Sequence, residues 1–242
     1  MTVFGGILAG GTGTRMGAAN GLPKQFLDVA GVPVIVRTLR RFFEVEDLDG
    51  IVIAMHPSWQ DYTTDLLAKN RVDVSRVTIV DGGATRFESL VNLARACLRL
   101  AESWGVRDDV LMINHDCARP FVSAEILRNN IAAAKEYDMA TTSIPTIDTV
   151  LLSKDGRVSD CVPNRSTVFL DQGPQTVRVR HFLSLVEELT DEERAKYIEA
   201  GRLYIDKGFK VVIVPGDRNN FKLTTPFDLK LAESLIKEGV LT

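Results

Sequence analysis

The fold is decided by the stretch Ile7-Leu8-Ala9-Gly10-Gly11-Thr12-Gly13-Thr14-Arg15-Met16-Gly17, with Leu22-Pro23-Lys24-Gln25 a few residues later. An apolar run from Val3 to Ala9 ends in four glycines within eight positions, and two cations, Arg15 and Lys24, follow. Such a run is typical of a buried strand, and the glycines are typical of a tight loop at its carboxyl end. Because glycine has no Cβ atom, backbone N–H groups in the loop can approach an anion closely. With two cations beside it, the loop predicts a nucleoside triphosphate site.

Two well-known phosphate-binding loops do not match this pattern. No Gly-Lys-Ser or Gly-Lys-Thr closes the loop, so it is not a P-loop. The spacing from Gly11 to Gly17 is Gly-x-Gly-x-x-x-Gly with Arg15 inside it, which is not the dinucleotide-binding fingerprint. A structural alternative is that the glycines serve only the packing of a strand–helix junction. Arg15 and the Pro23-Lys24-Gln25 segment favour the phosphate site over that alternative.

Composition limits the classes to which the protein can belong. The 242 residues suffice for one large α/β domain or two small ones, and the net charge of −3 provides no basic footprint for nucleic acid. No apolar run reaches the length of about 18 residues that a membrane span needs, and the amino terminus lacks the cationic segment of a secretory signal. Cys97, Cys117 and Cys161 are too scattered for a disulfide framework or a zinc site. We therefore expect a cytoplasmic protein that binds neither membrane nor nucleic acid.

Strands and helices are expected to alternate along the chain. Short apolar runs predict strands at residues 3–9, 51–55, 77–80, 110–113, 140–144 and 211–214. Helices are expected after Pro33, at 58–69, after the Asp81-Gly82-Gly83 turn, after Ser123, after Thr190 and after Thr225. This alternation predicts an α/β fold with a Rossmann-like, mostly parallel, doubly wound sheet. Ligands bind beyond the carboxyl ends of the strands in such sheets, so the glycine loop and the segment around Asp116 are expected to converge.

Residues 146–171 interrupt the alternation. Two β-prone runs, Thr149 to Leu152 and Val158 to Val162, flank Ser153-Lys154-Asp155-Gly156-Arg157, and Asp-Gly between such runs predicts a β-hairpin. A hairpin cannot be a crossover unit of a parallel sheet. The segment is therefore expected to project from the sheet or to pair with something else.

Eight segments in order resemble the cytidylyltransferases that make CDP-activated polyols, over essentially the whole chain. They are Leu8 to Gly17, Pro23 to Leu27, Asp81-Gly82-Gly83, His115-Asp116 with Ala118-Arg119-Pro120, Asp148-Thr149, Pro163-Asn164-Arg165, Pro174-Gln175 and Lys222-Leu223-Thr224. The resemblance implies that CTP and a polyol phosphate give a CDP-polyol and pyrophosphate. It also implies one nucleotidyltransferase domain over residues 1–242, with an arm at about 146–171. In the homodimer that the family forms, this arm completes the active site of the partner.

Matched residue by residue, the resemblance implies roles for individual side chains. Arg15, Lys24 and Lys222 are similar to the family's catalytic cations, and Asp116 is similar to its magnesium-binding aspartate. The positions that resemble the nucleotide-binding set are Leu8, Ala9, Gly10, Gly11, Gly13, Thr14, Gly83, Arg86, Ser89, Asp116 and Cys117. Those that resemble the polyol-phosphate-binding set are Arg119, Thr149 and Arg165. The implied cofactor is Mg²⁺, which suits a site with few carboxylates and several phosphate oxygens.

The acceptor is less closely defined than the nucleotide. Ala84 stands where methylerythritol enzymes usually carry an aspartate, and Gly173 replaces a threonine that contacts the polyol phosphate. Segments such as Leu189 to Glu193 and Leu223 to Thr225 are more similar to the ribitol group. We therefore expect D-ribitol 5-phosphate as the acceptor, as in teichoic acid biosynthesis. The alternative is 2-C-methyl-D-erythritol 4-phosphate, as in isoprenoid biosynthesis.

The implied reaction explains which residue types are present. A phosphate oxygen is already anionic at neutral pH, so its in-line attack on the α-phosphorus of CTP needs no general base. Catalysis then consists mostly of positioning and of cation supply. Two other classes stay open at this point: a dinucleotide-dependent oxidoreductase and a non-catalytic nucleotide-binding dimer. The loop spacing and the absence of an acidic residue closing the strand at 51–55 count against the first. The retained cations and Asp116 count against the second.

Several of these residues also have simpler interpretations. A simpler interpretation of Asp116 and Arg119 is that they form only a surface ion pair. His115 is expected to be a structural hydrogen-bonding group, because one histidine without other ligands makes a poor metal site. Cys117 is expected to be a small buried filler. A simpler interpretation of Lys222 is that it is an ordinary solvated lysine. Phe221 and Leu223 beside it count against this, because they should anchor its backbone.

Overall fold

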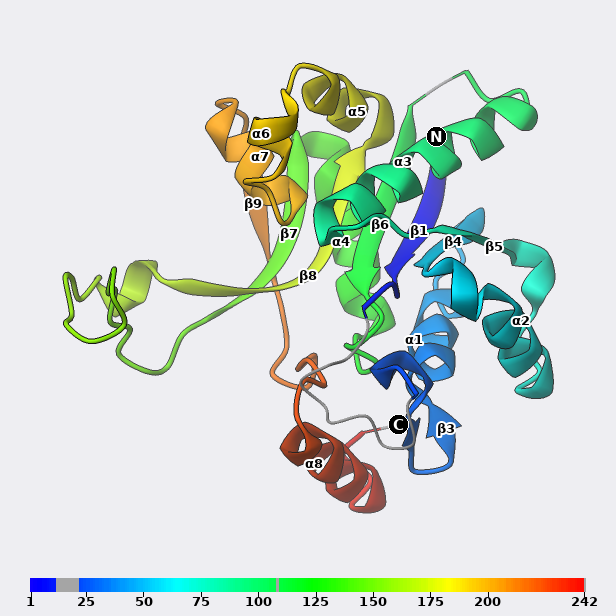
Figure 1. Ribbon diagram of the computed structural model, residues 1–242, viewed down its shortest axis with the longest axis horizontal. Coiled ribbons are helices and arrows are strands. Elements are labelled where there is room, and N and C mark those ends of the chain that lie inside the picture. The colour runs from blue at the N-terminus through cyan, green and yellow to red at the C-terminus, as the bar shows by residue number, and fades with distance from the viewer. Residues whose placement is uncertain (12–21, 108, 242) are drawn as a thin grey trace.

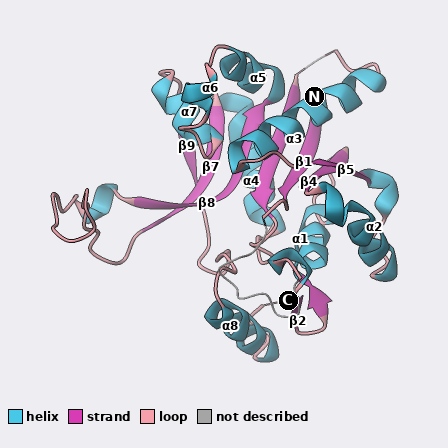
Figure 2. Cartoon of the chain, in the orientation of Figure 1, coloured by secondary structure: helices cyan, strands magenta, loops and turns pink. Residues whose placement is uncertain are grey.

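A computed structural model describes residues 1–11, 22–107 and 109–241 of the chain. Its centre is a seven-stranded sheet with the strand order β5-β4-β1-β6-β8-β7-β9 (Figures 1 and 2). The strands are β1 (Thr2–Leu8), β4 (Gly50–Met55), β5 (Val77–Asp81), β6 (Val110–Asp116), β7 (Met139–Pro145), β8 (Phe169–Arg178) and β9 (Val211–Pro215). A separate two-stranded ladder pairs β2 (Asp28–Val29) with β3 (Val32–Pro33).

The sheet is mostly parallel, as the alternation of strands and helices predicts. Strands β5, β4, β1 and β6 pair in parallel, and so do β7 and β9, whereas β8 runs antiparallel to both of its neighbours. The register sets Leu8 beside Asp116 on β6 and beside Ala54 on β4. The carboxyl end of β1 therefore lies between two other carboxyl ends, where the glycine loop begins.

Helices cover both faces of the sheet (Figure 1). Alternate residues of β6 separate the two cores, since Leu111 and Ile113 join one cluster while Val110 and Met112 join the other. The first cluster contains α1 (Val34–Phe43) and α4 (Ala124–Glu136), and the second contains α3 (Arg86–Ser103), α5 (Val179–Glu187) and α7 (Ala200–Asp206). The remaining helices are α2 (Gln60–Lys69), α6 (Asp191–Arg194) and α8 (Pro226–Lys237), with short 3₁₀ turns at Lys24–Phe26, Pro57–Trp59, Val74–Arg76 and Arg165–Thr167. No helix in the described part of the chain is long and apolar enough to cross a membrane.

Several helix starts carry the capping residues that the sequence indicates. Thr225 caps α8 with Pro226 in the first position, and the Thr225 and Asp228 side chains form a reciprocal capping box. Ser123 caps α4. Thr190 also begins a capping box, but the helix that follows, α6, has only four residues. Side-chain oxygens satisfy the first backbone N–H groups in each case.

The arm at residues 146–171 projects from the sheet, but it is not the regular hairpin that the sequence predicts (Figures 1 and 2). Its base is formed by the ends of β7 and β8, where Pro145 pairs with Phe169. Beyond that base, within residues 146–168, the strand pairing is reduced to one isolated bridge between Leu152 and Cys161. The Asp-Gly turn does form, because the Asp155 carboxylate accepts from the backbone N–H groups of the two residues after Gly156. The β-prone runs lack the packing partners that would extend the ladder.

Candidate active site

A cavity of about 330 Å³ opens at the carboxyl ends of β1 and β6. This is the position where open α/β sheets bind ligands. It is lined by Leu8, Ala9, Gly10, Gly11, Lys24, Gln25, Gly83, Ala84, Thr85, Arg86, Ser89, Asp116, Cys117, Ala118 and Lys222. These residues come from five separate segments of the chain, so the fold, and not sequence proximity, assembles the cavity.

Hydrogen bonds to the backbone carbonyls of Leu8 and Ala9 hold one wall of the cavity. The N–H of Cys117 donates to the carbonyl of Leu8 over 3.1 Å, which extends the β1–β6 pairing past the last residue of the strand. The buried Gln25 side chain donates through Nε2 to the Ala9 carbonyl over 2.9 Å. Gln25 belongs to the 3₁₀ turn that Lys24 begins, so this bond fixes Lys24 beside the start of the glycine loop.

The opposite wall is the turn that leads into α3. The Gly83 N–H donates to the Ser89 hydroxyl over 3.0 Å, and that hydroxyl donates to the Thr85 carbonyl over 3.0 Å. Thr85 and Glu88 form a capping box at the helix start. A Cβ atom at Gly83 would overlap the Cβ atom of Glu88, so only glycine fits this close approach.

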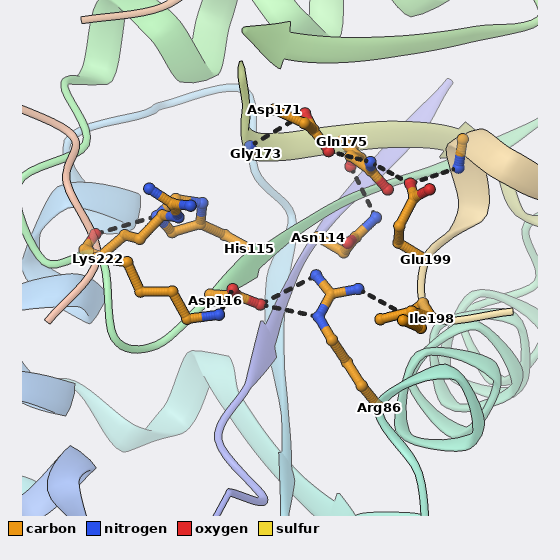
Figure 3. A network of polar contacts seen from close by, with 12 residues as sticks. Arg86, Asn114, His115, Asp116, Asp171, Gly173, Gln175, Ile198, Glu199 and Lys222 are labelled. Carbon is orange, nitrogen blue, oxygen red and sulfur yellow. Dashed lines mark hydrogen bonds and ion pairs between the residues drawn. The ribbon is translucent and has the colours of Figure 1, made fainter. Parts of the chain in front are cut away.

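The most polar part of the cavity is centred on Asp116, the last residue of β6. Its Oδ1 accepts from Arg86 Nη2 at 2.9 Å and Nε at 3.1 Å, and its Oδ2 accepts from Lys222 Nζ at 2.6 Å (Figure 3). The Asp116 side chain is 15% exposed, against 31% for Arg86 and 34% for Lys222. One carboxylate thus aligns two cations that still have surface free to meet a ligand.

Electrostatics keep this carboxylate ionised. Burial by itself would raise the pKa of Asp116, but the charges of Arg86 and Lys222 outweigh it and hold that pKa well below its usual range. Burial raises the pKa of the neighbouring Cys117 thiol to about 12, so the thiol stays neutral. Cys117 is only 2% exposed and is a small buried filler, as expected, although part of it lines the cavity.

The residues present fit Mg²⁺ only if the protein and the phosphate groups of a bound ligand hold the ion together. The described part of the chain holds no group of three or more His, Cys, Asp or Glu side chains that could enclose a metal ion. Asp116 is the carboxylate that faces the cavity, so phosphate oxygens would have to supply most other ligands, which is the ligand set that Mg²⁺ prefers. Both Asp116 oxygens accept from cations, so the ion would replace one of those contacts.

The structure brings most of the sequence-predicted nucleotide and catalytic positions together at this cavity. Those that line it are Leu8, Ala9, Gly10, Gly11, Lys24, Gly83, Arg86, Ser89, Asp116, Cys117 and Lys222. Gly13, Thr14 and Arg15 lie outside the described residues. Lys222 is not an ordinary solvated lysine, because its ammonium group is paired with Asp116.

The surface ion pair between Asp116 and Arg119 does not form. Asp116 pairs with Arg86 and Lys222 instead, and Arg119 donates through Nη1 to the Asn220 carbonyl over 2.8 Å. Arg119 also does not line the cavity. His115 has the structural role expected of it, since its Nε2 lies 3.0 Å from the Arg119 carbonyl and its side chain is buried.

The two arm residues lie away from the cavity of their own chain. Thr149 and Arg165 are exposed, and Arg165 donates through Nη1 to the Ile147 carbonyl over 3.1 Å within the arm. Figure 1 shows the arm extending from the sheet to the side of the body that carries β9. Within one chain, therefore, the polyol-phosphate set is not brought together.

Four residues that line the cavity were missed by sequence reasoning: Gln25, Ala84, Thr85 and Ala118. Gln25 had a detectable signal, since it directly follows Lys24 in a conspicuous motif. Thr85 could have been identified as the N-cap of α3 from Glu88 three residues later. Ala84 was noted only as a departure from an aspartate and Ala118 only as part of a motif, because an alanine side chain carries no functional group.

Comparisons with known proteins find one family and one fold. The family model of IspD, 2-C-methyl-D-erythritol 4-phosphate cytidylyltransferase, matches residues 3–238. The chain is similar to the 4-diphosphocytidyl-2C-methyl-D-erythritol synthase of Anaerococcus prevotii, with a TM-score of 0.76 and 25% identity over 98% of this chain and 96% of that one. It is also similar to the 2-C-methyl-D-erythritol 4-phosphate cytidylyltransferase of Thermus thermophilus, with a TM-score of 0.73 and 25% identity over 98% of this chain and 100% of that one. The Francisella tularensis enzyme of the same name shares the fold, with a TM-score of 0.76 at 21% identity over 97% of this chain and 99% of that one.

Proposed function

The chain belongs to the 2-C-methyl-D-erythritol 4-phosphate cytidylyltransferase family, and we propose that it transfers a cytidylyl group from CTP to 2-C-methyl-D-erythritol 4-phosphate. Family membership makes it a CTP-dependent nucleotidyltransferase. The observation that carries the proposal is the Arg86–Asp116–Lys222 arrangement, which faces Lys24 and the start of the glycine loop across one cavity. Cations gathered at a strand end suit the joining of two anions.

The site residues divide the work of such a transfer. Gly83 and Ser89 shape the wall that would receive the base and ribose, while Lys24 and the loop at Gly10 and Gly11 would receive the triphosphate. An acceptor phosphate oxygen attacks the α-phosphorus, a new P–O bond forms, and the bond to the β-phosphate oxygen breaks. Pyrophosphate leaves with that electron pair. No proton has to be removed from the nucleophile. This agrees with the lowered pKa of Asp116, the one carboxylate among the described residues that line the cavity, because a low pKa makes it a weak base.

Lys222 and Arg86 are proposed to stabilise the transition state through charge. The Lys222 ammonium is 2.6 Å from Asp116, so its position is fixed before substrate arrives. Arg86 presents a planar fork with two N–H groups on Asp116, and its third contact is the Ile198 carbonyl at 2.9 Å. Preorganised cations of this kind lower the barrier because they need no reorganisation as charge develops. Mg²⁺ bound with the triphosphate would neutralise phosphate charge there, with Asp116 as its protein ligand.

The comparisons favour 2-C-methyl-D-erythritol 4-phosphate over the D-ribitol 5-phosphate that the sequence alone led us to expect. One structural observation keeps ribitol 5-phosphate as the second candidate. Gly173 has a φ of +63°, a backbone conformation that a threonine at this position would adopt only with strain. The positive φ at Gly173 suits glycine better than the threonine that the resemblance to the methylerythritol enzymes implies at this position.

We also propose that the protein acts as a homodimer in which the arm reaches the cavity of the partner. Apolar side chains on the arm are largely exposed, including Ile147 at 58%, Leu151 at 62% and Val158 at 67%. An exposed apolar set on a projecting arm is typical of an interface with a second chain. Arg165 lies on the same arm, away from its own cavity, so a partner's arm would supply this cation.

The test is pyrophosphate release from CTP, ATP, GTP and UTP with each of the two polyol phosphates and Mg²⁺. We expect turnover with CTP and a higher kcat/KM for the methylerythritol phosphate than for the ribitol phosphate. A clear preference for the ribitol phosphate would replace the acceptor and leave the cytidylyl transfer intact. Absence of pyrophosphate release with CTP and either acceptor would contradict the proposed function.

A further inference from the structure

Two carboxylates outside the nucleotide cavity share one amide group. Gln175 Nε2 donates to Asp171 Oδ2 over 3.0 Å and to Glu199 Oε2 over 2.6 Å (Figure 3). Asp171 is exposed and Glu199 is half-buried, whereas Gln175 is 3% exposed. The three side chains therefore form a continuous acidic wall, here called the Asp171–Glu199 wall, with its middle member locked in place.

The sheet register places this wall on the same face and at the same end as Asp116. Gln175 on β8 pairs with Asn114 on β6, and the Asn114 side chain donates to the Gln175 carbonyl over 2.9 Å. Asp116 is two residues beyond Asn114, so it lies on the same face of β6 and about 7 Å further along the strand. Thr141 on β7 also pairs with Gln175, and its hydroxyl donates to Asp171 over 2.6 Å.

Hydrogen bonds of residues beside the wall lead toward Arg86 at one end and toward the Lys222 segment at the other. Next to Glu199, the Ile198 carbonyl accepts from Arg86, which holds Asp116. At the other end, the carbonyl of Gly173 accepts from the buried Asn220 side chain, two residues before Lys222. None of the three wall residues lines the cavity, but these contacts place the wall next to the Arg86–Asp116–Lys222 group.

The wall also has hydrogen-bonding capacity that the described residues do not satisfy. Gln175 Oε1 and Asn114 Oδ1 are buried and have no donor in the described part of the chain. A buried acceptor without a donor is unfavourable, so a ligand with O–H groups would complete this arrangement. Carboxylates accept strongly from hydroxyls and repel phosphate. The wall therefore suits the uncharged, hydroxyl-bearing end of a polyol phosphate and not its phosphate.

We propose that Asp171 and Glu199, aligned by Gln175, bind the hydroxyl groups of the acceptor and so determine acceptor specificity. This inference rests on the proposed function, because it assumes that a polyol phosphate is the acceptor. The wall orients the acceptor by its two ends, with hydroxyls at Asp171 and Glu199 and phosphate at Lys222. Gln175 is a positioning residue, since it acts through the two carboxylates.

The test uses Asp171→Asn and Glu199→Gln in the full-length enzyme, because both substitutions keep the shape of the side chain and remove its charge. Glu199 also caps α7 by accepting from the backbone N–H groups of Gly201 and Arg202, so the Tm of Glu199→Gln is measured together with its kinetics. We expect KM for the preferred acceptor to rise at least about tenfold, the scale of a hydrogen bond to a charged group, with KM for CTP within about twofold. The matched control is Asp206→Asn on α7, a carboxylate that pairs with Arg202 instead and should leave both KM values unchanged. Wild-type kcat/KM for an acceptor that lacks one hydroxyl is measured as well, which does not depend on the folding of any variant.

If the wall binds the acceptor, an acceptor that lacks one hydroxyl has a lower kcat/KM with the wild-type enzyme. The same acceptor shows little further loss with the variant in which the carboxylate that binds this hydroxyl is replaced. Unchanged acceptor KM in both variants would overturn the inference while the proposed function stands. So would acceptor and CTP KM values that rise together with a lowered Tm, because that pattern indicates a structural role. If a variant does not fold, equal kcat/KM for the intact and deoxy acceptors in the wild type overturns the inference. A wild type without transferase activity overturns the proposed function, and the wall with it.

Discussion

Lys222 Nζ lies 2.6 Å from Oδ2 of Asp116, although 106 positions separate the two residues in the sequence. Asp116 ends a central strand, and Lys222 precedes the last helix of the chain. The Leu223 N–H donates to the Ala118 carbonyl over 2.8 Å, which fixes the Lys222 segment against the end of β6. The pair is therefore a property of the fold, and it fixes the position of the Lys222 ammonium group.

Replacement of Lys222 by alanine should lower kcat by at least about a hundredfold, the scale for removing one preorganised charge-stabilising group. The free energy of unfolding should fall by about 1 to 3 kcal/mol, because Asp116 is only 15% exposed and would keep Arg86 but lose the charge of Lys222. Steady-state pyrophosphate release and thermal unfolding measure the two quantities. Lys230→Ala, an exposed lysine on α8, is the matched control and should retain full turnover. Normal kcat in Lys222→Ala would remove Lys222 from the catalytic set.

Replacement of Arg86 by lysine should lower kcat/KM for CTP by about tenfold or more, even though the charge is kept. A lysine cannot reproduce the two N–H contacts to Asp116 together with the contact to the Ile198 carbonyl. Titration with CTP and steady-state kinetics measure the loss. The control is Arg99→Ala, because Arg99 is exposed on the same helix. Equal kcat/KM in Arg86→Lys and wild type would show that the planar fork is dispensable.

Stability should fall below neutral pH because of His115. Burial lowers its pKa from 6.5 to about 4, so between these values the unfolded chain binds a proton that the folded chain does not. The contribution of neutral His115 to the free energy of unfolding is therefore complete above pH 6.5. It is lost as the pH falls toward 4, which lowers the free energy of unfolding by up to about 3 kcal/mol. Urea unfolding at several pH values compares the wild type with His115→Gln. Identical pH slopes in the two proteins would contradict a buried, neutral His115.

Mixing two inactive variants should restore activity if the arm acts in the partner's site. In a mixed dimer of Arg165→Ala and Lys222→Ala subunits, one of the two cavities has both residues intact. We expect recovery of up to about a quarter of wild-type activity after subunit exchange, since random pairing makes half of the dimers mixed and each has one working site. Absence of recovery after verified exchange would place Arg165 in its own subunit's site or outside any site.

The residues that line the cavity at the glycine loop and at the end of β6 could be predicted from sequence, because this part of the cavity is built from local signals. A glycine loop after an apolar strand and polar residues at the end of another strand are both visible without a structure, and parallel topology brings them together. The ion pair between Arg86 and Asp116 was not predicted, because the resemblance indicated only a nucleotide contact for Arg86. Pair geometry between distant segments depends on helix and strand placement, which short motifs do not encode.

Strand β8 was missed for a physical reason. Gly173 and Pro174 lie inside β8, and both residues indicate a turn or loop in a single sequence. The strand tolerates them at a register shift against β7, between the pairings of Thr141 and Ser143. The projecting arm was predicted from its Asp-Gly turn, but the prediction of a regular hairpin was wrong. The exposed β-prone runs of the arm lack a packing partner among the described residues.

The most direct test of the central claim follows isotope from acceptor to product. The enzyme is incubated with CTP, Mg²⁺ and 2-C-methyl-D-erythritol 4-phosphate or D-ribitol 5-phosphate whose phosphate oxygens carry ¹⁸O, and the products are analysed by ³¹P NMR and mass spectrometry. Attack by the acceptor phosphate on the α-phosphorus predicts a CDP-polyol that retains the label, including the oxygen that bridges its two phosphorus atoms, and pyrophosphate without label. Label in the pyrophosphate, or no labelled CDP-polyol from either acceptor, would contradict cytidylyl transfer at this site.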